Sequence, residues 1–309
     1  MALSNRLKKW KRKIKIALSR PKEKKLSQSI DISKVSILCM VLGPYRNLTT
    51  LTGSIMSLHP NCQVLNHGID RIMGDKKLNF LQNYSMTTLD NFLKYAIFIS
   101  GGGQRGNYGG SITFSHAYAE NSEMSESYRH LFGDKMVKDE IHCLFWKESL
   151  HITNILQKFP KKFTQILNEN PNIKFILPVR NTLDCVESNI STGMATIYPD
   201  IGKIFDRKIL IRRILEDYHW FFSLKKRYPE RFFWFFQDEI NREKLLQLAK
   251  FLNLSGDECW LNYALKNYHV RSKYKHTDEA RIFFQETVNT MFRDFPEERC
   301  KLLEFTGEN

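Results

Sequence analysis

Short and almost continuous apolar runs alternate with amphipathic stretches along most of the chain. Apolar runs of five to eight residues are typical of strands that are buried on both faces, and apolar positions at three- and four-residue steps are typical of helices. Because the two patterns alternate, the sequence predicts an α/β fold with a P-loop-like parallel sheet flanked by helices. The predicted strands are residues 35–42, 172–179 and 232–236, and the predicted helices are 51–58, 183–190, 204–227 and 280–303.

Residues 1–30 differ from the rest of the chain in charge. Residues 1–26 hold eleven Lys or Arg against one acidic residue, Glu23, so they carry +10 of the formal net charge of +14 and leave +4 for the remainder. Apolar residues recur there at helical spacing. We therefore predict a basic amphipathic segment over residues 1–30 and one α/β domain over 31–309. The apolar stripe consists of Leu3, Leu7, Trp10, Ile14, Ala17 and Leu18.

A basic amphipathic helix suits an anionic membrane surface, where each Lys or Arg adds on the order of 1 kcal/mol near the headgroups. The alternative is a disordered arm that binds nucleic acid through charge alone, and no specific nucleic acid is expected as a partner. The chain contains no uncharged apolar run of membrane-spanning length, and its six cysteines lack metal-ligand spacing. We expect a cytoplasmic protein, with attachment to the inner membrane face through residues 1–26 as an option.

Arg46 and two threonines follow the first predicted strand. Gly43-Pro44 ends that strand, and a helix is predicted just after Thr49 and Thr50. The first N–H groups of a helix lack intrahelical partners, so a cation and two hydroxyls beside them can form an anion site. At this position alone, an incidental arginine in a surface loop is an equally good interpretation.

A second unit of the same kind begins at Arg180, directly after the strand predicted over residues 172–179. Ser188 lies eight positions later, two turns into the following helix. An arginine at the strand tip and a hydroxyl on the helix can hold one phosphate together. Because the unit occurs twice, the sequence predicts a ligand with two separated phosphates.

The two units resemble the phosphate motifs of the sulfotransferase family, which uses 3′-phosphoadenosine-5′-phosphosulfate (PAPS) as sulfuryl donor. Residues 46–50 match the family's 5′-phosphosulfate loop, Lys/Arg-x-Gly-Thr-Thr, except that Leu48 stands where the family usually has Gly. Arg180 and Ser188 match its 3′-phosphate motif, an Arg and a Ser eight positions apart. The donor-binding residues that the resemblance implies are Arg46, Asn47, Leu48, Thr49, Thr50, Arg180 and Ser188.

The resemblance covers roughly residues 35–260. His59-Pro60 looks like the His-Pro of the Golgi and bacterial branches, and residues 145–149 resemble their Lys-Asp-Pro segment. The Arg-Lys-Gly signature of the cytosolic branch is absent. Residues 270–275 are the candidate replacement, with Arg271, Ser272 and Lys273 as donor contacts, although an ordinary basic loop is the alternative.

The same resemblance implies a catalytic base. In the tyrosylprotein-type branch a Glu eight residues after the His of His-Pro takes the acceptor's proton, and His67 has that position counted from His59. An imidazole titrates near neutral pH and suits the role, with His116 as the reserve candidate. Arg46 and Lys147 would stabilise the charge on the departing phosphate and the sulfuryl oxygens, with no metal ion.

The function that follows from the resemblance is transfer of a sulfuryl group from PAPS to an acceptor hydroxyl on a carbohydrate or glycolipid. The glycine-rich residues 100–110 are expected to form a loop over the acceptor, with Arg105 and Tyr108 as contacts. One alternative is a catalytically inactive membrane-surface binding protein, which would explain Leu48. Another is a P-loop kinase, although Gly-x-x-x-x-Gly-Lys-Ser/Thr is absent.

Overall fold

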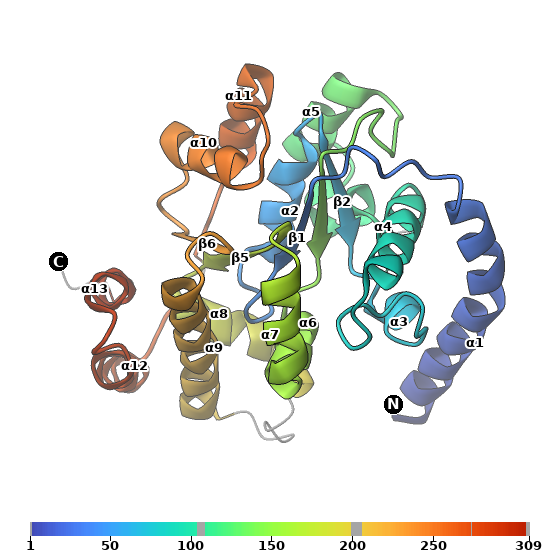
Figure 1. The fold of residues 1–309 in the computed structure, drawn as a ribbon. Helices are drawn as coiled ribbons and strands as arrows, with labels where there is room; N and C mark the ends of the chain where they lie inside the picture. Colours follow the sequence, from blue (N-terminus) through green and yellow to red (C-terminus); the bar gives the residue numbers. More distant parts are fainter. Residues whose placement is uncertain (1, 104–108, 199–205, 273, 307–309) are drawn as a thin grey trace.

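A twisted sheet runs through the middle of the fold in Figure 1. The computed structural model describes residues 2–103, 109–198, 206–272 and 274–306, and within them six strands form one sheet in the order β3-β2-β4-β1-β5-β6. Neighbouring strands are parallel except for the antiparallel pair β2 and β3. The strands are β1 (Ile37–Val41), β2 (Cys62–Asn66), β3 (Gly110–Ser111), β4 (Cys143–Lys147), β5 (Ile173–Val179) and β6 (Phe232–Phe236).

Helices cover both faces of this sheet and confirm the predicted α/β class (Figure 1). The first seven are α1 (Ala2–Ser27), α2 (Thr49–Ser57), α3 (Ile69–Ile72), α4 (Met86–Ser100), α5 (Glu123–Phe132), α6 (Leu150–Lys158) and α7 (Pro160–Glu169). The later ones are α8 (Thr182–Ser191), α9 (Arg207–Arg227), α10 (Arg242–Phe251), α11 (Glu258–Asn267), α12 (Asp278–Met291) and α13 (Pro296–Glu304).

Successive side chains of each strand point to opposite faces, so the core has two halves. Cys39 and Val41 of β1 belong to the half that contains residues of α2, α5, α10 and α11. Leu38 and Met40 belong to the other half, with residues of α4, α6, α7, α8, α9 and α12. The continuous apolar character of β1 follows from this burial on both faces.

The predicted terminal helix over residues 280–303 is wrong, because the structure has two helices there. α12 ends at Met291 and α13 begins at Pro296. A proline inside a helix lacks the N–H for the i→i−4 hydrogen bond and clashes with the preceding turn, whereas the first helical position tolerates it. Pro296 therefore starts a new helix.

The N-terminal helix α1 extends well beyond the predicted apolar stripe and lies against α4 and α3 (Figure 1). Ile16 is buried, whereas the side chains of Trp10 and Leu18 are 63% and 76% exposed. Among the residues described, no helix combines the length and apolar character needed to cross a bilayer. The polar contacts of α1 join Arg20 to the backbone oxygens of Asp70 (3.4 Å) and Gly74 (3.3 Å), Glu23 to Arg71 (3.1 Å) and Tyr95 (2.7 Å), and Lys24 to Asp75 (2.8 Å).

Candidate active site

The carboxyl ends of four neighbouring parallel strands bring the main candidates together. His67 follows β2, Lys147 ends β4, Arg46 follows β1 and Arg180 follows β5, and these strands are adjacent in the order β2-β4-β1-β5. All four residues line one cavity of about 1280 Å³. Ligands of open α/β sheets bind at this edge. The two strand-then-Arg units therefore meet in one cavity.

The side chain of Asn47 anchors the loop between β1 and α2. It is buried, and its Nδ2 donates to the backbone oxygen of Pro178. Its Oδ1 accepts from the backbone N–H of Arg180 (2.9 Å) and from the hydroxyl of Tyr218 (2.7 Å). Asn47, predicted to contact the donor, thus fixes the Arg46 loop against the end of β5, and it does not line the cavity.

Leu48 adopts the left-handed conformation that the family's glycine would take freely. Its φ is 58°, and Arg46 and His67 have φ of 63° and 61°. A non-glycine residue pays about 1–2 kcal/mol in this region, and such residues concentrate at functional sites. The leucine side chain makes no capping hydrogen bond, so the first N–H groups of α2, beside Thr49 and Thr50, are left for a ligand.

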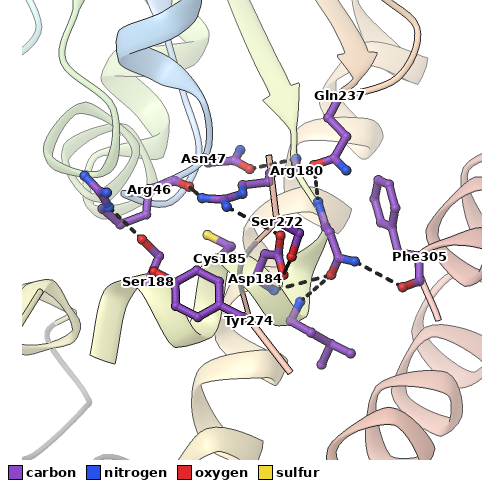
Figure 2. A network of polar contacts seen from close by, with 12 residues as sticks. Arg46, Asn47, Arg180, Asp184, Cys185, Ser188, Gln237, Ser272, Tyr274 and Phe305 are labelled. Atoms are coloured by element: carbon purple, nitrogen blue, oxygen red, sulfur yellow. Dashed lines mark hydrogen bonds and ion pairs between the residues drawn. The ribbon is translucent and has the colours of Figure 1, made fainter. Parts of the chain in front are cut away.

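Arg46 pairs with Ser188, the hydroxyl that was predicted to hold a phosphate together with Arg180. Arg46 Nε donates to Ser188 Oγ at 2.8 Å (Figure 2). The cause is the course of α8: Asn189 Nδ2 donates to the backbone oxygen of Tyr45 at 2.8 Å, which brings the second turn of α8 against the Arg46 loop. Ser188 is buried beneath that loop and does not line the cavity.

Arg180 is held by the neighbouring backbone and by a buried carboxylate. Its Nη1 donates to the backbone oxygen of Arg46 at 3.3 Å, and its Nη2 lies 3.4 Å from Asp184 Oδ2. Its Nε atom is buried and has no hydrogen-bond partner among the described residues. Arg180 lines the cavity, but this Nε is shielded from it.

Asp184 also ties the segment after α11 to this network (Figure 2). Its Oδ1 accepts from Ser272 Oγ at 2.8 Å and lies 2.9 Å from His276 Nε2. The side chain of Ser272 therefore faces Asp184 and does not line the cavity, whereas Arg271 lines it. Lys273, the third residue predicted in this segment, lies outside the described residues.

His67 contacts two polar side chains from the end of β4. Its Nε2 lies 3.2 Å from Lys147 Nζ, its Nδ1 lies 3.5 Å from Glu148 Oε2, and its backbone oxygen accepts from Trp146 Nε1 at 2.8 Å. In the neutral ring these partners assign the proton to Nδ1, facing Glu148, and leave Nε2 as the acceptor. Nε2 is the atom that a general base uses.

The pKa values of Lys147 and Glu148 are both lowered, for different reasons. Lys147 is 4% exposed, and burial together with the charge of Arg46 lowers its pKa to about 8 although Glu148 acts in the opposite direction. Burial acts to raise the pKa of Glu148, but the hydrogen bond from His67 and the charges of His67, His151 and Lys147 outweigh it, so the net pKa is lowered. Glu148 is therefore a buried carboxylate beside the base candidate.

The sequence reasoning missed the role of Glu148. Tyr45 also donates to it, from its hydroxyl to Oε1 at 3.2 Å. The available signal was an acidic residue directly after Lys147, at the same strand end. The sequence does not reveal that Glu148 lies beside His67, because β2 and β4 are far apart in the chain and adjacent only in the sheet.

His116, the reserve candidate for the base, is exposed and lines the same cavity. Gly109 packs against the backbone beside His67, since a Cβ on Gly109 would lie 2.9 Å from Gly68 Cα. Arg105 and Tyr108, the predicted acceptor contacts, lie outside the described residues. The glycine-rich region thus meets the end of β2 beside the cavity.

Cations outnumber carboxylates in the cavity lining. Such an excess, with the open start of α2, fits a polyanionic ligand. The cations are Lys11, Lys15, Arg46, Lys147, Arg180 and Arg271, and the carboxylates are Asp70 and Glu148.

No family model and no curated protein sequence matches the chain. Among solved structures it is similar to the sulfotransferase domain from the curacin biosynthetic pathway, at 13% identity and a TM-score of 0.42, over 82% of this chain and 98% of that one. It is also similar to the sulfotransferase domain from the Synechococcus PCC 7002 olefin synthase, at 14% identity and a TM-score of 0.41, over 82% and 94%. Because both the sequence identity and the TM-score are this low, the activity has to be argued from the residues of the site.

Proposed function

We propose that the protein is a sulfotransferase that moves a sulfuryl group from PAPS to a hydroxyl of a carbohydrate or glycolipid. The observation that carries the proposal is the convergence of Arg46, Lys147 and Arg180 on one cavity, with the imidazole of His67 at the same edge. The likeness of residues 46–50 and of the Arg180–Ser188 spacing to PAPS-binding motifs supports the choice of donor.

The residues around the cavity fit the donor's charge. Arg46, Thr49 and Thr50 would hold the 5′-phosphosulfate at the start of α2, where the helix leaves N–H groups for an anion. Arg180 and Arg271, which both line the cavity, would hold the 3′-phosphate. When bound, PAPS supplies the sulfuryl group, and the nucleotide that leaves carries the negative charge on its 5′-phosphate.

The proton of the acceptor hydroxyl would pass to Nε2 of His67. Glu148 orients the ring through Nδ1–H and stabilises the imidazolium that forms. Nε2 faces Lys147 Nζ at 3.2 Å, so the Lys147 ammonium would turn to the sulfuryl oxygens of the bound donor and leave the lone pair of Nε2 for the acceptor's proton. A base, a carboxylate that positions it and a buried cation are therefore contributed by adjacent strands.

Transfer of radiolabelled sulfate from PAPS to a panel of saccharides and glycolipids tests the proposal. We expect transfer that persists in EDTA, because the proposed chemistry uses only side chains of the chain. Nucleotide binding without transfer to any acceptor would point to the inactive binding protein. Magnesium-dependent transfer of phosphate from ATP would point to the kinase.

A further inference from the structure

Helix α1 contributes two lysines to the cavity. Lys11 and Lys15 lie one turn apart and both line it, together with Asp70 at the start of α3. The contacts of Arg20, Glu23 and Lys24 and the burial of Ile16 attach α1 to the body of the protein. The position of the two lysines is therefore built into the fold.

These lysines lie on the acceptor side of the cavity. α1 packs against α3 and α4, and α3 directly follows His67. In the row β2-β4-β1-β5, His67 and Arg180 follow the two outer strands, so α1 is on the side of the base candidate and away from Arg180. Lys11 and Lys15 are thus positioned for charge on the acceptor.

The size of the cavity leaves room for a second ligand. Its volume of about 1280 Å³ exceeds the roughly 300–1,000 Å³ of a typical single-ligand pocket. Arg46, Lys147, Arg180 and Arg271 are the cations assigned to the donor. Lys11 and Lys15 remain, and two long lysine side chains one helical turn apart on the same face can both reach one diphosphate group.

The same helix carries an apolar stripe beside the lysines. Trp10, Ile14 and Leu18 follow one another at four-residue steps and are 63%, 38% and 76% exposed. Each of them lies one or three positions from the nearer of Lys11 and Lys15, so the stripe borders the cavity-lining face. An acceptor with a charged part and a hydrocarbon part would contact both.

We infer that Lys11 and Lys15 form an acceptor subsite for the phosphate or diphosphate of a lipid-linked saccharide, with its hydrocarbon chain along Trp10, Ile14 and Leu18. The inference rests on the proposed function and names its acceptor class. It also gives the exposed apolar stripe of α1 a role, because a lipid-linked acceptor is presented at a bilayer surface.

Inorganic pyrophosphate tests the charged half of the subsite. It is titrated by calorimetry into the full-length protein saturated with 3′,5′-adenosine bisphosphate, so that the donor phosphate sites are filled. The variant Lys11→Gln/Lys15→Gln should bind pyrophosphate about 30-fold more weakly, roughly five-fold for each lysine. The control Lys22→Gln/Lys25→Gln, which removes the same charge from exposed positions outside the cavity lining, should bind as the wild type does.

Equal weakening in the two variants, or no pyrophosphate binding by the nucleotide-loaded wild type, would overturn the subsite. Failure of the wild type to bind the nucleotide in the first titration would count against the proposed donor instead. If pyrophosphate affinity of the nucleotide-free protein still depended on Lys11 and Lys15, the subsite would be supported. The acceptor subsite and the proposed donor can therefore fail independently of each other.

Farnesyl diphosphate tests the apolar half. We expect it to bind at least about ten-fold more tightly than pyrophosphate, because part of its chain leaves water. Trp10→Ser/Leu18→Ser should abolish this gain, and Leu26→Ser/Ile282→Ser, at exposed apolar positions elsewhere, should keep it. Equal affinity for the two diphosphates in the wild type would overturn the lipid assignment.

Discussion

The ammonium nitrogen of Lys147 lies 3.2 Å from Nε2 of His67, and burial lowers the pKa of this lysine to about 8. Protonated Lys147 attracts an anionic donor, and neutral Lys147 does not. A bound anion restores the charged form, so affinity for 3′,5′-adenosine bisphosphate should fall as the pH rises past about 8, with binding there taking up protons. The affinity should fall by about ten-fold for each unit by which the bound anion raises the pKa of Lys147.

Calorimetry in buffers of different ionisation enthalpy measures this proton uptake. Lys147→Met should lower the affinity at neutral pH and remove this pH dependence. If the affinity of the wild type did not change as the pH rises past the pKa of Lys147, about 8, this would contradict a role for the Lys147 charge in donor binding.

Removal of the base candidate should affect turnover and spare donor binding. His67→Ala is expected to lower turnover roughly 10²–10⁴-fold, because the acceptor hydroxyl loses its proton acceptor. His130→Ala, at an exposed position on α5, is the matched control. Full activity of His67→Ala would end the assignment, and a comparable loss in His116→Ala alone would transfer it to His116.

Glu148 is expected to act by positioning His67. Glu148→Gln keeps the shape of the side chain but removes the charge facing Nδ1, and we expect turnover to fall about 10²-fold. The KM for PAPS should rise much less, and only because the loss of the Glu148 charge lowers the pKa of Lys147 further. Glu140→Gln alters a second His–Glu pair, with His142 at 2.6 Å, outside the cavity lining. A rise in KM with unchanged turnover would contradict the positioning role.

Substitution of Leu48 tests whether the loop is strained. Leu48→Gly should be more stable than Leu48→Ala by about 1 kcal/mol, because both lose the side chain and only glycine adopts a φ of 58° freely. At Leu246 in the interior of α10 the order should reverse, since glycine destabilises helix interiors. Denaturant unfolding measures both pairs, and a Leu48→Ala variant that is more stable than Leu48→Gly would rule out the strain.

The sequence predicts the parts of the fold that depend on local pattern. β1, β5 and β6 are apolar runs because helices cover both faces of the sheet, and Arg46 and Arg180 could be placed at strand ends without knowledge of the fold. β3 is only two residues long and has no periodicity to detect.

The contacts that define the site depend on tertiary structure. The pairing of Arg46 with Ser188 follows from the position of α8 against the Arg46 loop, which no spacing rule contains. The reach of Lys15 into the cavity likewise depends on how α1 packs against α3 and α4. The sequence predicted cation and base candidates, and the fold determines which of them meet.

The most direct test of the central claim is a calorimetric comparison of 3′,5′-adenosine bisphosphate with adenosine 5′-phosphate in the wild type, Arg46→Ala and Arg180→Ala. We predict that the wild type prefers the bisphosphate, that Arg180→Ala loses this preference by roughly 10- to 100-fold in affinity, and that Arg46→Ala weakens both nucleotides. No binding of the bisphosphate, or an Arg180→Ala variant that keeps the full preference for it, would contradict a single nucleotide held between the two arginines.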